Sequence, residues 1–157
     1  MPKTDADWMR LAIETTRAGL AKGQTPFGAV ITRGEELVVA AHNVVWETTD
    51  ITAHAEVNAL RLACRKLGII DLKGCTIYST TEPCPMCFSA IHWANIDRIV
   101  FGTSIADAAA AGFNELPISN FEMKEKGKSR VEIVPGFLKE EAKELFRVFK
   151  EKGAKVY

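Results

Sequence analysis

The sequence predicts an α/β domain built on a five-stranded mixed sheet. Two apolar runs flank a turn at Arg33-Gly34-Glu35, which indicates an antiparallel hairpin. From residue 37 to residue 102, apolar runs alternate with helical patterns, which is typical of parallel strands joined by crossover helices. The expected strands are 27–31, 37–41, 75–79, 98–102 and 130–134.

The composition is that of one ordinary globular domain. The chain has 157 residues, of which 25% are charged and 47% are hydrophobic. Lys plus Arg and Asp plus Glu are balanced at 20 each, so no net positive field favours nucleic acid. No apolar run approaches the roughly 18 residues that a membrane span requires. The start Met-Pro-Lys-Thr-Asp, without an apolar leader, and only four cysteines predict a cytoplasmic protein without disulfides.

The N-terminal half is expected to open with a helix. A capping-box pattern at residues 4–7 precedes apolar residues at helical spacing, and the helix ends before Gly23. After the hairpin, residues 42–52 are polar and lack periodicity, which predicts a loop that can overhang a ligand. An apolar helical face then covers residues 54–67, and Gly68 is a favourable C-cap.

The C-terminal half continues the alternation of helices and strands. The expected helices are 85–94, 104–111 and 138–152, and the chain ends in a short tail closed by Tyr157. Residues 118–129 are polar, with three lysines around a glutamate and a glycine, which predicts a solvated, mobile loop. No repeat or second domain is found, so residues 1–157 are expected to form a single domain.

Two short clusters predict a metal site, namely His54-Ala55-Glu56 and Pro83-Cys84-Pro85-Met86-Cys87. One imidazole and two thiols suit zinc, which is usually four-coordinate, so three protein ligands leave one position for water. Cys84 and Cys87 would share one face of a helix that begins at Pro85, near its positive end, where thiolates are favoured. Both clusters are expected at the carboxyl ends of strands, where ligands of such sheets bind.

Glu56 distinguishes a catalytic metal site from a structural one. Bound zinc lowers the pKa of its water to about 7, and a neighbouring carboxylate can carry the proton. Taken without Glu56 and His54, the Cys-x-x-Cys pair could be a redox pair or part of a structural zinc knuckle. Such a knuckle would be completed by Cys64, Cys75, His42 or His92.

His-x-Glu followed by Pro-Cys-x-x-Cys is the signature of zinc nucleobase deaminases. Together with Pro26-Phe27-Gly28-Ala29-Val30, the motifs His54-Ala55-Glu56 and Glu82-Pro83-Cys84-Pro85-Met86-Cys87 follow the order of the cytidine-deaminase-like superfamily. Residues 5 to about 115 resemble this superfamily. The resemblance implies a three-layer α-β-α fold with helices on both faces of the sheet. Two branches are similar, the bacterial guanine deaminases and the tRNA adenosine deaminases.

Three features resemble the guanine deaminase branch. They are the stretch Ala90-Ile91-His92-Trp93-Ala94, the helix and acidic loop over residues 107–115, and the amphipathic C-terminal helix followed by Tyr157. In that branch the C-terminal segment, here about residues 138–157, is exchanged between the subunits of a homodimer. Its last aromatic residue closes the partner's pocket.

The resemblance also implies roles for individual residues. His54, Cys84 and Cys87 would hold one Zn²⁺, and Glu56 would move protons. Glu115, where the family often has Asp, would be a second catalytic acid. The implied substrate contacts are Phe27, Asn43, Ala55, Trp93 and Tyr157.

The implied reaction is the hydrolysis of guanine to xanthine and ammonia by attack of a zinc-activated water at C2. A tRNA adenosine deaminase would instead attack C6 of a flipped-out adenine and would need a basic track, whereas the C-terminal helix mixes lysines with glutamates. Cytosine or a triazine such as ammeline would also suit the chemistry. A fourth alternative, a non-catalytic zinc-stabilised interaction domain, would make Glu56 a mere surface charge.

Overall fold

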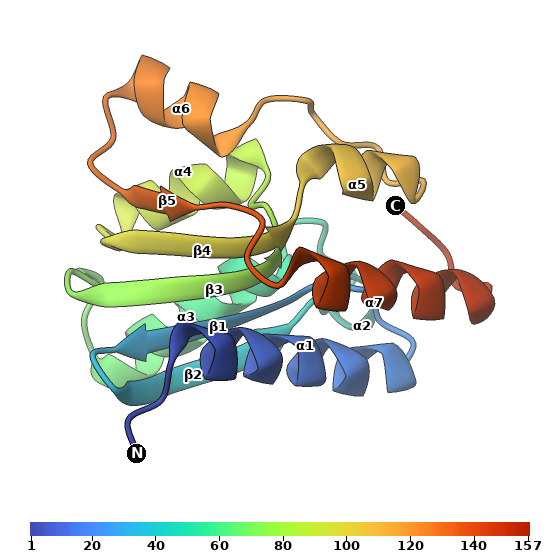
Figure 1. Cartoon of the computed structure of the whole chain (residues 1–157), viewed down its shortest axis with the longest axis horizontal. Coiled ribbons are helices and arrows are strands. Elements are labelled where there is room, and N and C mark those ends of the chain that lie inside the picture. Colours follow the sequence, from blue (N-terminus) through green and yellow to red (C-terminus); the bar gives the residue numbers. More distant parts are fainter.

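The computed structural model describes residues 1–157 and is organised around one mixed sheet with strand order β2-β1-β3-β4-β5 (Figure 1). The strands are β1 Gly28–Arg33, β2 Glu36–His42, β3 Cys75–Thr81, β4 Arg98–Thr103 and β5 Glu132–Val134. Strand β1 is antiparallel to both β2 and β3, whereas β3, β4 and β5 are parallel. The five-stranded mixed sheet predicted from the sequence is therefore confirmed.

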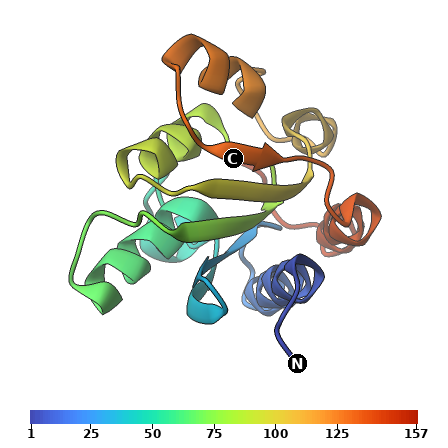
Figure 2. The ribbon, with the colours of Figure 1, turned by 60° about the vertical axis from the view of Figure 1, so that its left-hand side comes forward.

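Helices cover both faces of the sheet. The helices are α1 Asp5–Ala21, α2 Val45–Thr48, α3 Ala55–Leu67, α4 Pro85–Trp93, α5 Ile105–Ala110, α6 Asn120–Gly127 and α7 Lys139–Glu151. Figure 2 shows α1 and α7 on one side of the sheet and α3 and α4 on the other. Because both faces are covered, β1 and β3 are buried along almost their whole length. None of the seven helices combines the length and the apolar character that crossing a bilayer requires.

Two stretches predicted as loops contain helices, and these predictions were wrong. The stretch 118–129 contains α6, because the Ser119 side chain accepts a hydrogen bond from the Glu122 N–H and caps the helix. Asn120, the first residue of α6, is fully buried, so the helix is anchored although most of its surface is polar. The loop before His54 contains the short helix α2. Strand β5 is also two residues shorter at its start than predicted.

The first helix is fixed to the sheet through Asp5. Its carboxylate accepts hydrogen bonds from the Tyr78 hydroxyl at 2.7 Å and from two Arg98 nitrogens at 2.8 and 2.7 Å. The bonds from Arg98 hold the pKa of Asp5 below its usual value near 3.8. Because the folded-state pKa is lowered, this carboxylate stabilises the fold above about pH 4 and loses that contribution as the pH falls through the lowered pKa.

Replacing Asp5 with asparagine is therefore expected to lower the free energy of unfolding by about 1.5 kcal/mol at pH 7 and by much less near pH 2. Urea unfolding at the two pH values measures the difference. Glu132→Gln is the control, because Glu132 lies 3.6 Å from Arg98 but its side chain is 67% exposed, so its effect should be near zero. An equal loss at both pH values for Asp5→Asn would contradict this account.

Candidate active site

Helices α3 and α4 bring the predicted metal ligands together at the carboxyl end of β3. His54 is the N-cap of α3, Cys84 is the N-cap of α4, and Cys87 lies in the first turn of α4. The His54 Nδ1 atom is 3.6 Å from the Sγ atoms of both Cys84 and Cys87. These three side chains form the one group in the structure whose ligand atoms could hold a metal ion, all within 4.8 Å of one another.

The three ligand atoms fit zinc. With Zn–S bonds of about 2.3 Å, Zn–N bonds of about 2.0 Å and tetrahedral angles, the expected N-to-S separation is about 3.5 Å. A hydrogen bond from Cys87, supported by one from His54, lowers the pKa of the Cys84 thiol to about 4, so Cys84 is a thiolate at neutral pH. Cys87 is buried, whereas His54 and Cys84 are partly exposed, which leaves one side of the group accessible.

The residues of the alternative zinc knuckle do not join this group. Cys64 and Cys75 are free thiols outside it, and Cys75 is fully buried in the core. The His42 Nδ1 atom lies 2.8 Å from the Asn43 carbonyl oxygen, and His92 lines a cleft elsewhere in the molecule. The candidate metal group therefore consists of three side chains, which is the number of protein ligands expected at a catalytic zinc site.

Glu56 lies beside the ligands and away from bulk solvent. It is in the first turn of α3 and only 6% exposed. Burial raises the pKa of Glu56 to about 7. A carboxyl group with a pKa in this range can both accept and give up a proton at neutral pH, as a general acid–base must. The alternative in which Glu56 is a surface charge does not fit this position.

Two adjoining cavities border the metal ligands. The inner one, about 20 Å³, is large enough for a single water. It is lined by Phe27, His54, Glu56, Thr81, Glu82, Cys84, Glu115 and Tyr157. The outer one, about 300 Å³, lies at the lower end of the range of small-molecule sites. It shares His54, Cys84, Glu115 and Tyr157 with the inner cavity and adds Ile51, Pro85, Met86, Phe113, Asn114 and Leu116.

Tyr157 closes the site of its own chain. Its hydroxyl accepts a hydrogen bond of 2.6 Å from Asn43 Nδ2 and lies 3.5 Å from Thr25 Oγ1. Its ring centroid is 5.6 Å from that of His54 and 5.4 Å from that of Phe113. Tyr157 therefore lies at the pocket, as a lid residue should. In this single chain it covers the chain's own pocket, whereas the family resemblance implied the pocket of a partner subunit.

The remaining predicted site residues, namely the other substrate contacts and the second catalytic acid Glu115, divide into two groups. Phe27 and Glu115 line the inner cavity, and burial raises the pKa of Glu115. Asn43 is fully buried behind Tyr157, with its Oδ1 accepting a hydrogen bond from the Val45 N–H, so it reaches the pocket only through the tyrosine hydroxyl.

Trp93 and Ala55 do not line either cavity. Trp93 is the last residue of α4 and 82% exposed, because α4 starts at the metal ligands and runs away from them for about 12 Å. The prediction that Trp93 packs against the ring of the substrate is therefore wrong for the pocket of a single chain. Ala55 is completely buried in the hydrophobic core.

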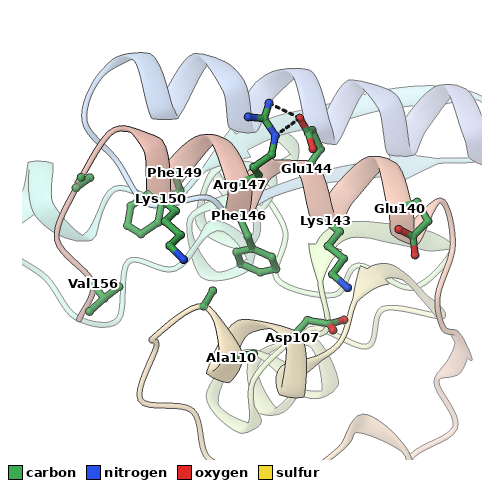
Figure 3. Close-up of a pocket in the computed structure, with 13 residues that line it drawn as sticks. Asp107, Ala110, Glu140, Lys143, Glu144, Phe146, Arg147, Phe149, Lys150 and Val156 are labelled. Carbon is green, nitrogen blue, oxygen red and sulfur yellow. Dashed lines mark hydrogen bonds and ion pairs between the residues drawn. The ribbon is translucent and has the colours of Figure 1, made fainter.

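Several residues at the pocket were not anticipated. No signal pointed to Thr81 or Phe113, although Thr81 ends the strand that leads to Cys84 and Phe113 is two residues before Glu115. Ile51 was not singled out either, but it belongs to the loop 42–52 that was expected to overhang a ligand. A larger cavity, about 620 Å³, lies elsewhere, between α5 and α7 (Figure 3). Phe146 and Ala110 face it from the two helices, and it contains no predicted site residue.

A mixed α/β sheet that places one imidazole, two thiols and a buried carboxyl group at one strand end defines a zinc-dependent hydrolytic deaminase. Residues 2–103 match the family model for the cytidine and deoxycytidylate deaminase zinc-binding region. The chain therefore belongs to this family of zinc-binding deaminases.

Relatives in two branches of the family are similar to this chain. A guanine deaminase from Bacillus subtilis is 43% identical over 105 residues, which are 67% of this chain and 65% of the relative. A tRNA-specific adenosine deaminase from the same organism is 32% identical over 145 residues, 92% of this chain and 88% of the relative. The solved structure of a guanine deaminase from Nitrosomonas europaea superimposes with a TM-score of 0.87 at 29% identity, over 96% of this chain and 86% of that one.

Proposed function

We propose that this deaminase acts on free guanine and releases xanthine and ammonia. Three glutamates line the inner cavity beside the metal ligands. Both carboxylate oxygens of Glu82 already accept backbone hydrogen bonds, and the observation that carries the proposal is that Glu56 and Glu115 are left to act on a substrate. Guanine presents two neighbouring donors, N1–H and the 2-amino group, and one carboxylate can accept from both. A second carboxyl group is then left to move protons. The 43% identity to a guanine deaminase supports the same substrate.

In the proposed reaction, water adds to C2 of guanine and the 2-amino group leaves as ammonia. A zinc ion held by His54, Cys84 and Cys87 would supply the Lewis acidity that makes this water a nucleophile at neutral pH. Glu56 takes one proton from the attacking water and delivers it to a ring nitrogen, so C2 becomes tetrahedral. Glu56 then transfers the second proton of the water to the amino group, the C–N bond breaks, and the ring regains its planarity.

The surrounding residues orient the base and exclude bulk water. Glu115 holds the donor edge of guanine, while Phe27 and Phe113 offer aromatic surfaces, their ring centroids 4.8 Å apart. The tail that carries Tyr157 covers the outer side of the site. A covered, apolar-walled pocket strengthens each polar contact to the reacting atoms.

The tRNA adenosine deaminase alternative has its own support, since one such relative aligns with 92% of this chain. Its substrate would need unpaired cations around the pocket. On α7, however, Arg147 pairs with Glu144 and Glu151, and Lys139 lies 3.5 Å from Asp107. Lys143 and Lys150 form no ion pair, but the helix carries four glutamates against its four cations and so has no net positive charge. A helix without net positive charge attracts phosphates weakly, which favours a free base as the substrate.

The experiment is ammonia release by zinc-loaded protein with guanine, adenine, cytosine, cytidine, ammeline and tRNA. The proposal expects release from guanine at least 100-fold faster than from any other compound. Release from tRNA that weakens steeply with salt would support the tRNA alternative. No release from any compound would favour a zinc-stabilised interaction domain.

We also propose that residues 138–157 are exchanged between two subunits. Helix α7 contacts α1 and β4 through a buried face of Ala142, Leu145 and Phe149. It is joined to the sheet by a short connection in which Leu138 adopts a left-handed conformation, with φ of 50°. A strained short hinge favours domain swapping, because the strain is released when the hinge opens.

Sedimentation of the full chain and of a chain ending before Leu138 tests the exchange. The full chain should sediment as a dimer and the truncated chain as a monomer without activity. A truncated chain that stays dimeric and active would refute the exchange. A cytoplasmic location stays an expectation that agrees with four free cysteines.

Asn43 is proposed to bind the base once Tyr157 moves. Asn43→Ala should then lower kcat/KM for guanine by about 100-fold, because a polar edge of the base is left unmatched in a closed site. Tyr157→Phe should change kcat/KM by less than about threefold. The Asn43 amide, which donates to the Tyr157 hydroxyl in the free protein, would donate to the base in the complex, so the hydroxyl is no longer needed there. Steady-state kinetics on both variants, with thermal unfolding as the check on folding, measures this. A larger loss for Tyr157→Phe would show that Asn43 acts only by holding the tail.

A further inference from the structure

Two buried polar residues outside the metal group connect it to α5 and α6. Glu82 is 8% exposed and Asn120 is completely buried. One carboxylate oxygen of Glu82 accepts a hydrogen bond from the Ile105 N–H at 3.0 Å, and the other accepts from the Asn120 N–H at 2.9 Å. Ile105 and Asn120 are the first residues of α5 and α6, so a negative charge lies at the positive ends of two helices.

The Asn120 side chain completes the connection to the metal group. Its Nδ2 donates a 2.7 Å hydrogen bond to the carbonyl oxygen of Pro83, the residue before the metal ligand Cys84. Pro83 has no N–H, so this carbonyl is its one polar backbone group. On the opposite side, the Glu82 N–H donates to the Thr103 carbonyl at 2.7 Å. The segment between β3 and Cys84 is therefore held from two sides.

The position of Asn120 indicates more than a role in packing. Its Oδ1 is the one buried side-chain oxygen or nitrogen in the structure without a hydrogen-bond partner. Burying an unpaired amide oxygen costs stability, and an apolar residue at this position would avoid that cost. Unlike an apolar residue, the Asn120 amide donates a hydrogen bond to the Pro83 carbonyl oxygen. A buried amide that leaves one oxygen unpaired while its nitrogen holds the residue before a metal ligand resembles the outer partners that orient metal ligands.

We infer that Glu82 and Asn120 are positioning residues that hold the Pro83–Cys84 peptide so that the Cys84 thiolate meets zinc together with His54. Asn120 fixes the peptide directly, and Glu82 fixes Asn120 by binding its N–H. Partners of metal ligands typically change metal affinity by about 10–100-fold when they are removed. Because coupling between two sites is reciprocal, zinc binding should in turn order the start of α6.

Zinc affinity and the spectrum of the cobalt-substituted protein test the inference without any substrate. Asn120→Ala should bind zinc at least about tenfold more weakly in competition with a chelator, and its cobalt absorption bands should shift. Ser119→Ala is the matched control, because it removes the cap of the same helix but leaves the Asn120 side chain in place. The control should keep the affinity and the cobalt spectrum of the unaltered protein. An Asn120→Ala variant with both properties unchanged would overturn the inference.

A second measurement uses the unaltered chain, in case Asn120→Ala does not fold. Hydrogen exchange at the backbone amides of Ile105 and Asn120 should be at least about tenfold slower in the zinc-loaded than in the zinc-free protein. Equal exchange rates would contradict a connection between α6 and the metal group. Since neither experiment involves deamination, a failure here is distinguishable from the failure of guanine as the substrate.

Discussion

Replacing Glu56 with glutamine is expected to lower kcat for deamination by about 10³-fold while the protein still binds one zinc ion. Glutamine preserves the shape of the side chain but can neither take a proton from water nor return it to the amine. Since Glu56 is only 6% exposed, its replacement should leave the surface of the protein unchanged. Steady-state kinetics on zinc-loaded protein, with the zinc content measured on the same sample, give both quantities.

Glu122→Gln is the control for the loss of one carboxylate, because Glu122 lies on exposed α6, away from the cavities. Its activity should equal that of the unaltered chain. The rival interaction-domain interpretation predicts that Glu56→Gln has no measurable consequence. A Glu56→Gln variant that retains full activity would remove the basis for the proton-transfer role.

The second large effect is expected from Cys87→Ala. Cys87 is fully buried at the metal group, and without its sulfur only two protein ligands remain. The variant should contain no stoichiometric zinc and should show no deamination above background. Its melting temperature should no longer respond to a chelator, whereas that of the unaltered chain should fall, because zinc that binds only the folded state stabilises it.

Cys64→Ala provides the comparison for this prediction. Cys64 is a free thiol on α3 outside the metal group, so its removal should leave zinc content, activity and the response to chelator unchanged. Loss of zinc from Cys64→Ala would indicate a four-ligand structural site and would contradict the assignment of three ligands. Retention of zinc by Cys87→Ala would contradict it equally.

The sheet and the metal ligands were predictable because their signals are local. The turn at Gly34 lies between two apolar runs, and the spacing of Cys84 and Cys87 places both at the start of one helix. Helix α6 was not predictable in the same way. Its sequence is polar and lysine-rich. The helix is anchored by one buried residue, Asn120, which forms hydrogen bonds with Glu82 and Pro83, almost forty positions earlier in the chain.

The site residues taken from the family resemblance show a similar division. Phe27 and Glu115 both line the pocket. Phe27 directly precedes β1, which is antiparallel to β3 and therefore starts at the edge where β3 ends, and Glu115 follows the helix that leaves β4 at that edge. Trp93 follows Cys87 closely in the sequence, yet a helix carries it to the opposite end of α4. Sequence proximity to a metal ligand is therefore a poor guide to proximity in space when a helix intervenes.

X-ray absorption at the zinc edge of the loaded protein tests the central assignment most directly. The assignment predicts two sulfur ligands at about 2.3 Å, one imidazole nitrogen near 2.0 Å, and one further light atom contributed by solvent. Three or more sulfurs, or a second imidazole in the fourth position, would mean that no place is left for a water beside Glu56. The hydrolytic mechanism would then be excluded.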